Sequence, residues 1–505
     1  MTFDFKALNL TVKKSIHDHP IPLKNIFFQY LNTAITFIFP LILFPYLTRV
    51  LSPEGYGKIG FYEAAFQVVL LISSFGIPYY GIREWGNLAE DKFAKSRLVA
   101  HLFLFNVLLS AISIICFVYF MTRPGLVFSN NRLTIYYVLL ILFSTCSLDW
   151  YFQAEEKFRF IFRRTLLTKI FLLIAVFVFV RNEADFTKYV FITLIIYIMI
   201  AITSVVMVLK NVLTKDYLRH FRPGVLLKKL SAFAGLGILA GFYINVDTLI
   251  LGHYADTASI GYYTVANKVA RMVIAVLVST TIVFFARIVS ADNRQHQNSQ
   301  AKIQQYSLTY LFHICLPAAT LVWFFGTEII TVLSGNAFMP AIQLLPYFSL
   351  IIVIVALHDF FVIQVLLSQR QEKKVFWLML AASIISFALN LLLIKIYGMK
   401  GAVISVLITE CIVLAGSVWL SKGIFTFSPQ IQRQFLSSLM IIPITYITAI
   451  LAKKFILPPM IILVSGALIS FGIYCLVQLY LFRNVFFVEM RGKLIQFLGA
   501  NKLWG

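Results

Sequence analysis

The sequence is short of charge. Only 13% of its 505 residues are charged, whereas 60% are hydrophobic. Soluble domains carry about 25% charged residues. Five cysteines lie singly in apolar stretches, without a Cys-x-x-Cys or Cys/His cluster, which disfavours both a disulfide framework and a structural zinc site. This composition excludes an ordinary soluble domain and predicts an all-α polytopic membrane protein.

Several sequence motifs of enzymes are also missing. No Gly-x-x-x-x-Gly-Lys-Ser/Thr run occurs, so direct ATP hydrolysis is not expected. Nothing resembles a nucleophile elbow, and no metal or cofactor is predicted. The first long apolar run follows a lysine-bearing segment and has no small-residue cleavage site, so a cleaved signal peptide is not expected. The loops are short, which predicts no soluble domain, and the missing motifs predict that the chain is not an enzyme.

Long apolar runs dominate what is present. A helix that crosses a bilayer needs about 20 mostly apolar residues. On this criterion the sequence contains about fourteen candidate spans. They are residues 26–48, 59–80, 98–121, 133–152, 165–180, 189–209, 230–252, 261–285, 307–333, 343–367, 375–394, 401–420, 435–452 and 460–482.

The basic residues set the expected orientation. With the N-terminus inside, 31 of the 43 lysines and arginines lie in or beside the cytoplasmic segments and 10 in the outer loops. This bias favours a multi-pass membrane protein with both termini cytoplasmic. The net charge of +22 is then a topology signal rather than a sign of nucleic-acid binding. The basic inner face would also attract the anionic headgroups of the lipid bilayer.

Two pairs of stretches suggest an internal repeat. Residues 59–65, IGFYEAA, are similar to residues 260–266, IGYYTVA, and residues 148–152, LDWYF, are similar to residues 358–362, HDFFV. Six spans separate the members of each pair. This predicts two six-helix lobes in parallel orientation, an arrangement found in transporters. The expected parts are a cytoplasmic N-terminal segment (1–24), an N-lobe of spans 1–6 (25–225), a C-lobe of spans 7–12 (226–425), and spans 13–14 with a cytoplasmic tail (426–505).

Four stretches resemble a known family. They are residues 45–57 (PYLTRVLSPEGYG), 80–84 (YGIRE), 148–153 (LDWYFQ) and 245–252 (NVDTLILG). All four are similar to motifs of Wzx-type polysaccharide-repeat flippases, a branch of the multidrug/oligosaccharidyl-lipid/polysaccharide exporter superfamily. Ser52 stands where that family usually has glycine. The resemblance implies a two-lobe helical fold that moves an undecaprenyl-diphosphate-linked oligosaccharide from the inner to the outer leaflet.

Two cations lie inside the eighth predicted span. Lys268 and Arg271 are three residues apart, so they share one helix face. Each charge costs about 2.5–3.5 kcal/mol at the centre of a membrane helix. We therefore predict a cationic wall that meets the diphosphate or an acidic sugar of the substrate. The alternative is an ion pair with one of three carboxylates in other spans, Asp247, Asp359 or Glu410.

Carboxylates in the spans are candidates for ion coupling. Burial disfavours the charged form of a carboxylate, which makes proton exchange accessible. Asp149 and Asp359 occupy matching positions in the repeat, and Asp247 and Glu410 complete the set. For Asp149 the competing interpretation is a structural one, because Arg159 and Arg163 follow it closely.

Arg49 and Arg83 lie at span ends within the family-like stretches. Snorkelling and topology account for both. The resemblance leaves two further roles open, binding of the substrate's diphosphate or contact between the lobes. The favoured function is the lipid-linked oligosaccharide flippase, with a polysaccharide polymerase and a chain-length regulator as further partners. The alternatives are a drug or cation exporter of the same superfamily and, from another class, a membrane-embedded polysaccharide polymerase or ligase. Short outer loops disfavour the last.

Overall fold

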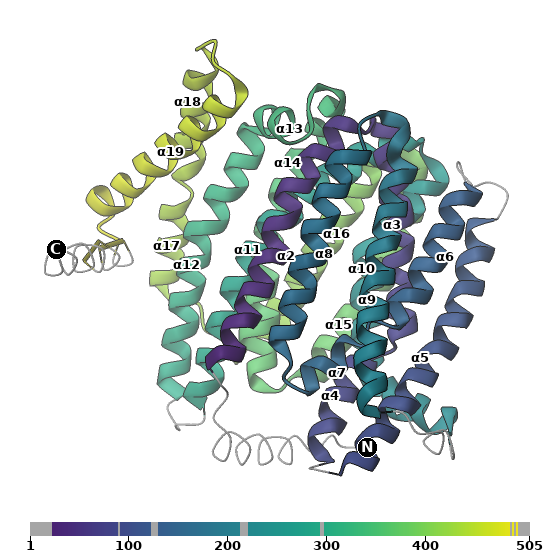
Figure 1. The fold of residues 1–505 in the computed structure, drawn as a ribbon. Helices are drawn as coiled ribbons and strands as arrows, with labels where there is room; N and C mark the ends of the chain where they lie inside the picture. The colour runs from purple at the N-terminus through teal and green to yellow at the C-terminus, as the bar shows by residue number, and fades with distance from the viewer. Residues whose placement is uncertain are drawn as a thin grey trace, which may run out of the picture. The chain divides into compact units, whose positions relative to one another are not determined.

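The structure is a computed structural model that describes residues 23–88, 91–122, 130–212, 221–292 and 297–484, together with 487–488 and 491–492. Within these residues the chain forms helices and their connections, with no strand (Figure 1). Most of the predicted N-terminal segment, residues 1–24, lies outside them. The expectation of an all-α membrane protein is confirmed.

The positions of the predicted spans agree with the structure, whereas their number differs. All fourteen predicted spans fall on helices of the structure. Among the described residues, twelve helical segments are long and apolar enough to cross a membrane. The predicted fifth and seventh spans, α8 (Phe158–Phe179) and α10 (Pro223–Tyr254), are not in that set. In α8, Arg159, Arg163, Arg164 and Lys169 lower the hydropathy. The count of fourteen is therefore not confirmed.

The chain divides into two compact units, with boundaries inside α3 (Pro53–Ser74) and α10. The first unit takes its described residues from Met1–Val50, Ala65–Pro124 and Ser129–Ile238. The second takes them from Leu51–Ala64 and Leu239–Gly505. The lobe boundaries predicted from the sequence stay a prediction.

The first unit is a helical bundle. In it α2 packs on α8, α8 on α9, and α9 on both α5 and α6, while α4 contacts α5 and α7. Apart from α3, α8 and α10, its helices are α2 (Leu23–Val50), α4 (Ile77–Asn87), α5 (Lys92–Met121), α6 (Asn131–Thr145), α7 (Asp149–Ala154) and α9 (Phe186–Val212), with a short 3-10 turn η1 (Glu183–Asp185).

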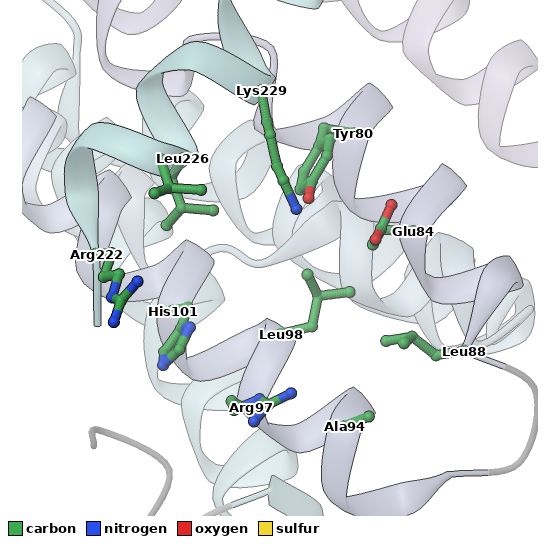
Figure 2. A pocket seen from close by; sticks show the side chains of 11 residues that line it. Tyr80, Glu84, Leu88, Ala94, Arg97, Leu98, His101, Arg222, Leu226 and Lys229 are labelled. Atoms are coloured by element: carbon green, nitrogen blue, oxygen red, sulfur yellow. The ribbon is translucent and has the colours of Figure 1, made fainter. Parts of the chain in front are cut away.

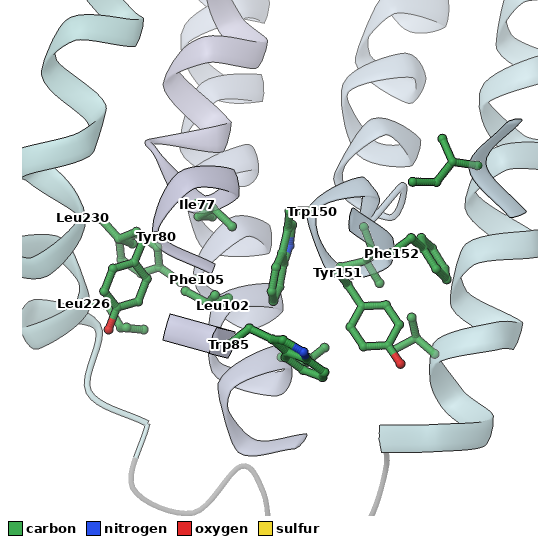
Figure 3. Close-up of a cluster of buried hydrophobic side chains, with 14 residues drawn as sticks. Ile77, Tyr80, Trp85, Leu102, Phe105, Trp150, Tyr151, Phe152, Leu226 and Leu230 are labelled. Carbon is green, nitrogen blue, oxygen red and sulfur yellow. The ribbon is translucent and has the colours of Figure 1, made fainter. Parts of the chain in front are cut away.

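Two of the family-like stretches meet in the core of this unit. Tyr80 and Trp85 of α4 belong to the same buried cluster as Trp150 and Tyr151 of α7 (Figure 3). A Cβ on Gly81 would lie only 2.5 Å from the Trp150 ring, so glycine is required for the close approach of the two helices. The stretches 80–84 and 148–153 are thus parts of one packing unit.

The second unit is built around α11, α12 and α14, which contact one another in all three pairings. Helix α14 also packs on α16, and α16 on α15. The described elements of this unit after α10 are α11 (Thr257–Asp292), α12 (Gln297–Phe324), α13 (Gly326–Ser334), η3 (Asn336–Leu344), α14 (Leu345–Asp359), η4 (Phe360–Leu366), η5 (Leu367–Gln369), α15 (Glu372–Tyr397), α16 (Met399–Leu420), α17 (Pro429–Ser438), α18 (Ile441–Lys453), α19 (Pro459–Leu476) and η6 (Val477–Leu481).

The first pair of repeat-related stretches forms a helix contact inside this unit. A Cβ on Gly57 of α3 would lie 1.9 Å from the carbonyl oxygen of Thr257, and one on Gly261 of α11 would lie 2.1 Å from that of Pro53. Gly60 meets the Thr264 side chain one turn further along. The residue numbers of both helices increase along the contact, so the two helices run parallel. Glycines at these positions let the backbones touch.

The last helices are joined to α12 by a buried polar cluster. The His313 Nδ1 atom lies 2.5 Å from the hydroxyl oxygen of Tyr474 on α19, and Asn484 donates a hydrogen bond to the other ring nitrogen. Gln434 of α17 accepts from Asn484, and Gln478 of η6 donates to the Ser437 carbonyl. The cluster supplements the direct packing of α12 on α17 and α18.

Candidate functional site

A charged cavity of about 310 Å³ lies within the second unit. Side chains of α10, α11, α14, α15 and α16 line it. Its ionisable lining residues are Asp247, Arg271, His358, Asp359 and Glu410, to which Tyr243 adds a hydroxyl and Asn267 an amide. Four of the eight predicted site residues therefore lie around one space, although they come from four different spans.

Asp247 is buried and has several hydrogen-bond donors. The backbone N–H and the hydroxyl of Thr248 both donate to its Oδ1 atom, at 2.5 and 3.1 Å. The Tyr263 hydroxyl of α11 donates to Oδ2. Tyr263 belongs to the repeat-related stretch 260–266, so Asp247 joins that stretch to α10. These bonds compensate for the burial of the carboxyl group.

Arg271 is exposed to the cavity. Its Nε donates to the Asn267 side-chain oxygen at 3.0 Å, and its Nη2 donates to the Ile244 carbonyl at 2.9 Å. Within the described part of the chain its hydrogen bonds thus go to neutral oxygens rather than to a carboxylate. The guanidinium, which has five N–H donors, retains donors for a further ligand.

Lys268 has a different environment. Its Nζ donates to the Tyr56 hydroxyl at 3.2 Å and lies 5.9 Å from the centre of the Tyr56 ring. Tyr56 belongs to the family-like stretch 45–57 and lies in α3, close to the glycine contact described above. Lys268 is half-buried and does not line the described cavity, so the two cations of the predicted wall have separate partners.

His358 and two carboxylates form a cluster at the cavity wall. The His358 Nε2 atom lies 3.2 Å from Glu410 Oε2, and its Nδ1 lies 3.9 Å from Asp359 Oδ1. All three side chains are less than 20% exposed. Just after Asp359 the α14 helix passes into the π-helical η4. Such π-helical segments occur frequently at functional sites.

Asp149, the repeat counterpart of Asp359, lies in the first unit and forms an ion pair with Arg164. Arg164 also donates to the Ser204 hydroxyl at 2.7 Å. The sequence pointed to Arg159 and Arg163 as neighbours of Asp149, and the structure corrects that choice. Arg164 is the one that turns into the bundle, with a side chain only 7% exposed.

Arg49 and Arg83, the remaining predicted site residues, are both exposed. Arg49 is in the last turn of α2, and Arg83 is in α4. Neither lines the cavity of the second unit. Their predicted substrate-binding roles stay predictions.

Sequence reasoning missed three contacts. His358 was visible only as the neighbour of Asp359, and its contact with Glu410 depends on how α14 packs on α16. The partners Tyr56 and Arg164 were equally hidden. Tyr56 had one usable signal, its place in a family-like stretch.

The charges determine what the cavity can hold. Three carboxylates face one guanidinium and one imidazole, so the lining is more acidic than cationic. A group of this composition can exchange protons or hold a cation, because neighbouring carboxylates and a histidine share charge. Arg271 adds a site for an anion at the same wall.

Comparisons with known proteins agree with this fold. The family model described as "Polysaccharide biosynthesis protein" matches residues 22–291. The chain is 23% identical over 398 residues to a protein of Escherichia coli strain K12 named "Putative O-antigen transporter", which covers 77% of this chain and 94% of that protein. It is also 23% identical over 397 residues to a protein of the same name from Shigella dysenteriae, covering 77% of this chain and 98% of that protein.

Two solved structures share the fold. The lipid II flippase MurJ in an inward closed conformation aligns with a TM-score of 0.69 at 16% identity, covering 91% of this chain and all of that one. An inward-facing multidrug resistance transporter of the MATE family, from the MOP superfamily, aligns with a TM-score of 0.60 at 13% identity over 78% of this chain and 94% of that one.

Proposed function

We propose that this chain, which belongs to the polysaccharide biosynthesis protein family, is a flippase for lipid-linked oligosaccharides. It would move undecaprenyl-diphosphate-linked repeat units from the cytoplasmic to the outer leaflet. The names of the two bacterial relatives support a substrate of the O-antigen class. The all-helical membrane fold supports transport rather than an enzymatic reaction.

The observation that carries the proposal is the charged cavity inside the second unit. Ionisable residues within membrane helices are costly and normally face a substrate path or one another. Arg271 offers unused donors to the negatively charged headgroup, and Asn267 provides an amide for hydroxyl groups. In transporters built from repeats, binding sites lie near the midplane and access alternates between the two sides.

We assign ion coupling to the carboxylates of this cavity. Asp359 and Glu410 share His358, and a change of protonation at any of the three would change the charge felt by Arg271. Asp247 has more hydrogen-bond donors and contributes mainly to the position of α11. Asp149 contributes least to coupling, because Arg164 neutralises it.

The cellular setting follows from the same proposal. The chain would reside in the bacterial cytoplasmic membrane with both termini cytoplasmic, as the distribution of lysine and arginine favours. A polysaccharide polymerase would consume the flipped repeat units on the outer side, and a chain-length regulator would act with it. No nucleic-acid partner is expected.

One observation favours a second candidate, a drug or cation exporter. Three carboxylates around the cavity would suit a cationic substrate. The two candidates differ in what Arg271 should do. An anionic headgroup needs its positive charge, whereas a cationic drug would be repelled by it.

A graded substitution series at Arg271 tests the proposal. Glutamine removes attraction and glutamate adds repulsion, so surface polysaccharide should fall in the order wild type, Arg271→Gln, Arg271→Glu. We expect about tenfold per step, equivalent to about 1.4 kcal/mol, with unchanged membrane abundance. Lipid-linked repeat units should accumulate in the inner leaflet. The control is Lys422→Glu, the same charge reversal at an exposed position after α16.

Three results would count against the flippase proposal. One is full polysaccharide display in a Lys268→Glu, Arg271→Glu double variant at normal abundance. Another is loss of cationic dye export in Glu410→Gln cells whose display is normal, which would select the exporter. The third is a lower abundance of the Arg271 variants that is restored when the charges of Arg271 and Glu410 are exchanged, which would assign Arg271 a structural role.

A further inference from the structure

A second cavity, of about 260 Å³, lies in the first unit and has the opposite charge character. Residues of α4, α5 and the first two turns of α10 line it, together with Leu88 after α4 and Arg222 before α10 (Figure 2). Its described lining residues include three permanent cations, Arg97, Arg222 and Lys229, and one carboxylate, Glu84. His101 adds a titratable imidazole.

In the part of the chain that the structure describes, the three cations Arg97, Arg222 and Lys229 form no ion pair. All three are exposed and line one space, Arg97 from α5, Lys229 from α10 and Arg222 from the position just before α10. Like charges brought together in this way favour an anion between them.

The backbone of α10 adds to this preference. Helix α10 is 32 residues long and begins at Pro223, directly after Arg222. Its first-turn residues Val225 and Leu226 form part of the cavity wall. The N-terminal end of a helix carries partial positive charge and unpaired N–H groups, which favour an anion nearby.

The rest of the lining is apolar. Leu88, Leu98, Val225 and Leu226 line the same space, and Tyr80 is buried beside them. A small inorganic anion would gain no favourable contact with these apolar side chains. A ligand with both a phosphate and an apolar body would contact both parts of the lining. Basic pockets between membrane helices bind lipid headgroups in this way.

We propose that this pocket binds the phosphate group of a membrane lipid, with Arg97, Arg222 and Lys229 as its ligands. Arginine suits this chemistry, because its planar fork donates two hydrogen bonds to a phosphate. The phosphate can come from a phospholipid headgroup or from a polyprenyl diphosphate. The pocket lies in a different unit from the charged cavity, and its binding does not depend on the proposed transport activity.

The test measures lipid retained by the purified full chain. The protein is placed in neutral phosphatidylcholine nanodiscs containing phosphatidylglycerol, and bound lipid is counted by native mass spectrometry after release. A triple variant, Arg97→Gln, Arg222→Gln and Lys229→Gln, should bind phosphatidylglycerol about 100-fold more weakly, since each basic residue contributes about fivefold. The matched control changes Arg159, Lys228 and Lys373 to glutamine, which are exposed cations outside the pocket.

A single substitution that removes a negative charge, and should therefore strengthen lipid binding, completes the test. Glu84→Gln removes the one carboxylate of the described lining, so phosphate should bind severalfold more tightly. This result does not depend on the triple variant folding well. Competition with farnesyl diphosphate in detergent separates the two sources: displacement of phosphatidylglycerol at equimolar concentration identifies a polyprenyl diphosphate, and resistance identifies the phospholipid.

Two results would overturn the proposal. The first is equal retention of phosphatidylglycerol by the pocket triple variant and the control triple variant. The second is weaker lipid binding in Glu84→Gln, because a site for an anion cannot lose affinity when a negative charge is removed. Failure here leaves the Arg271 series unaffected, since that series measures display.

Discussion

Two similar stretches of the sequence have very different surroundings in the structure. In the first unit, Asp149 follows Leu148, which adopts a left-handed backbone (φ 49°) between α6 and α7. In the second unit, Asp359 ends α14 just where the helix becomes π-helical. Both aspartates therefore lie where regular α-helical geometry is interrupted.

The electrostatic partners differ more than the backbone. Asp149 has a side chain 50% exposed and is held by the Arg164 guanidinium. Asp359 is 17% exposed, and its charged neighbours are His358 and Glu410, whose protonation can change. Because Arg164 is permanently charged, its ion pair gives Asp149 a structural role. A titratable neighbourhood makes the second one suited to coupling.

The largest expected effect follows from this contrast. Asp359→Asn should slow substrate flipping about 100-fold, the scale of a lost proton-transfer group, while Asp149→Asn changes the rate less than twofold. The measurement is flipping in vesicles with an imposed proton gradient. Glu63→Gln, at an exposed position in α3, is the control. Equal rates for Asp359→Asn, Glu63→Gln and wild type would remove Asp359 from the mechanism.

The other repeat-related pair provides a reference, because its members contact each other. In Gly261→Ala the new methyl group would overlap the Pro53 carbonyl oxygen, and in Gly57→Ala that of Thr257. Neither backbone atom can move aside alone, so we expect a loss of about 2 kcal/mol in stability, read as a lower thermal midpoint in detergent.

Gly60→Ala should cost less than either, because it meets the Thr264 side chain at 2.7 Å rather than backbone. Gly86→Ala is the matched control, since a Cβ there has no neighbour within 4 Å. An unchanged midpoint for Gly261→Ala would contradict the close contact of α3 and α11.

The smallest effect concerns the structural aspartate. Asp149→Asn should lower stability by about 1 kcal/mol, because solvent screens a half-exposed carboxylate, and it should leave flipping intact. A double-mutant cycle with Arg164→Gln should show that the two losses are not additive. Full additivity would mean that the ion pair contributes nothing, and the contrast between the two aspartates would lose its basis.

Much of the fold could be predicted from the sequence, because hydropathy acts along the chain. Each apolar run became a helix, and Asp247, Arg271, Asp359 and Glu410 stood out as ionisable residues within such runs. These residues can be identified from the sequence because a charge in a membrane helix has a high free-energy cost, which a partner or a function must offset.

What the sequence could not provide was the pairing between helices. The separation of Lys268 from Arg271 depends on the rotation of α11 against α3, which no local pattern encodes. The choice of Arg164 over Arg159 and Arg163 depends on which side of α8 faces the bundle. The π-helical turn after Asp359 contains no glycine or proline from which it could have been predicted.

The His313 cluster bears on how the chain is made. Tyr474 and Asn484 follow His313 by 161 and 171 positions. At about 5–20 residues per second, α12 emerges from the ribosome roughly 10–30 s before these partners. During that interval the imidazole must stay hydrated or shielded, since hydrocarbon offers it no hydrogen bond. A chain that ends before α19 would therefore expose the His313 imidazole of α12 without its Tyr474 and Asn484 partners.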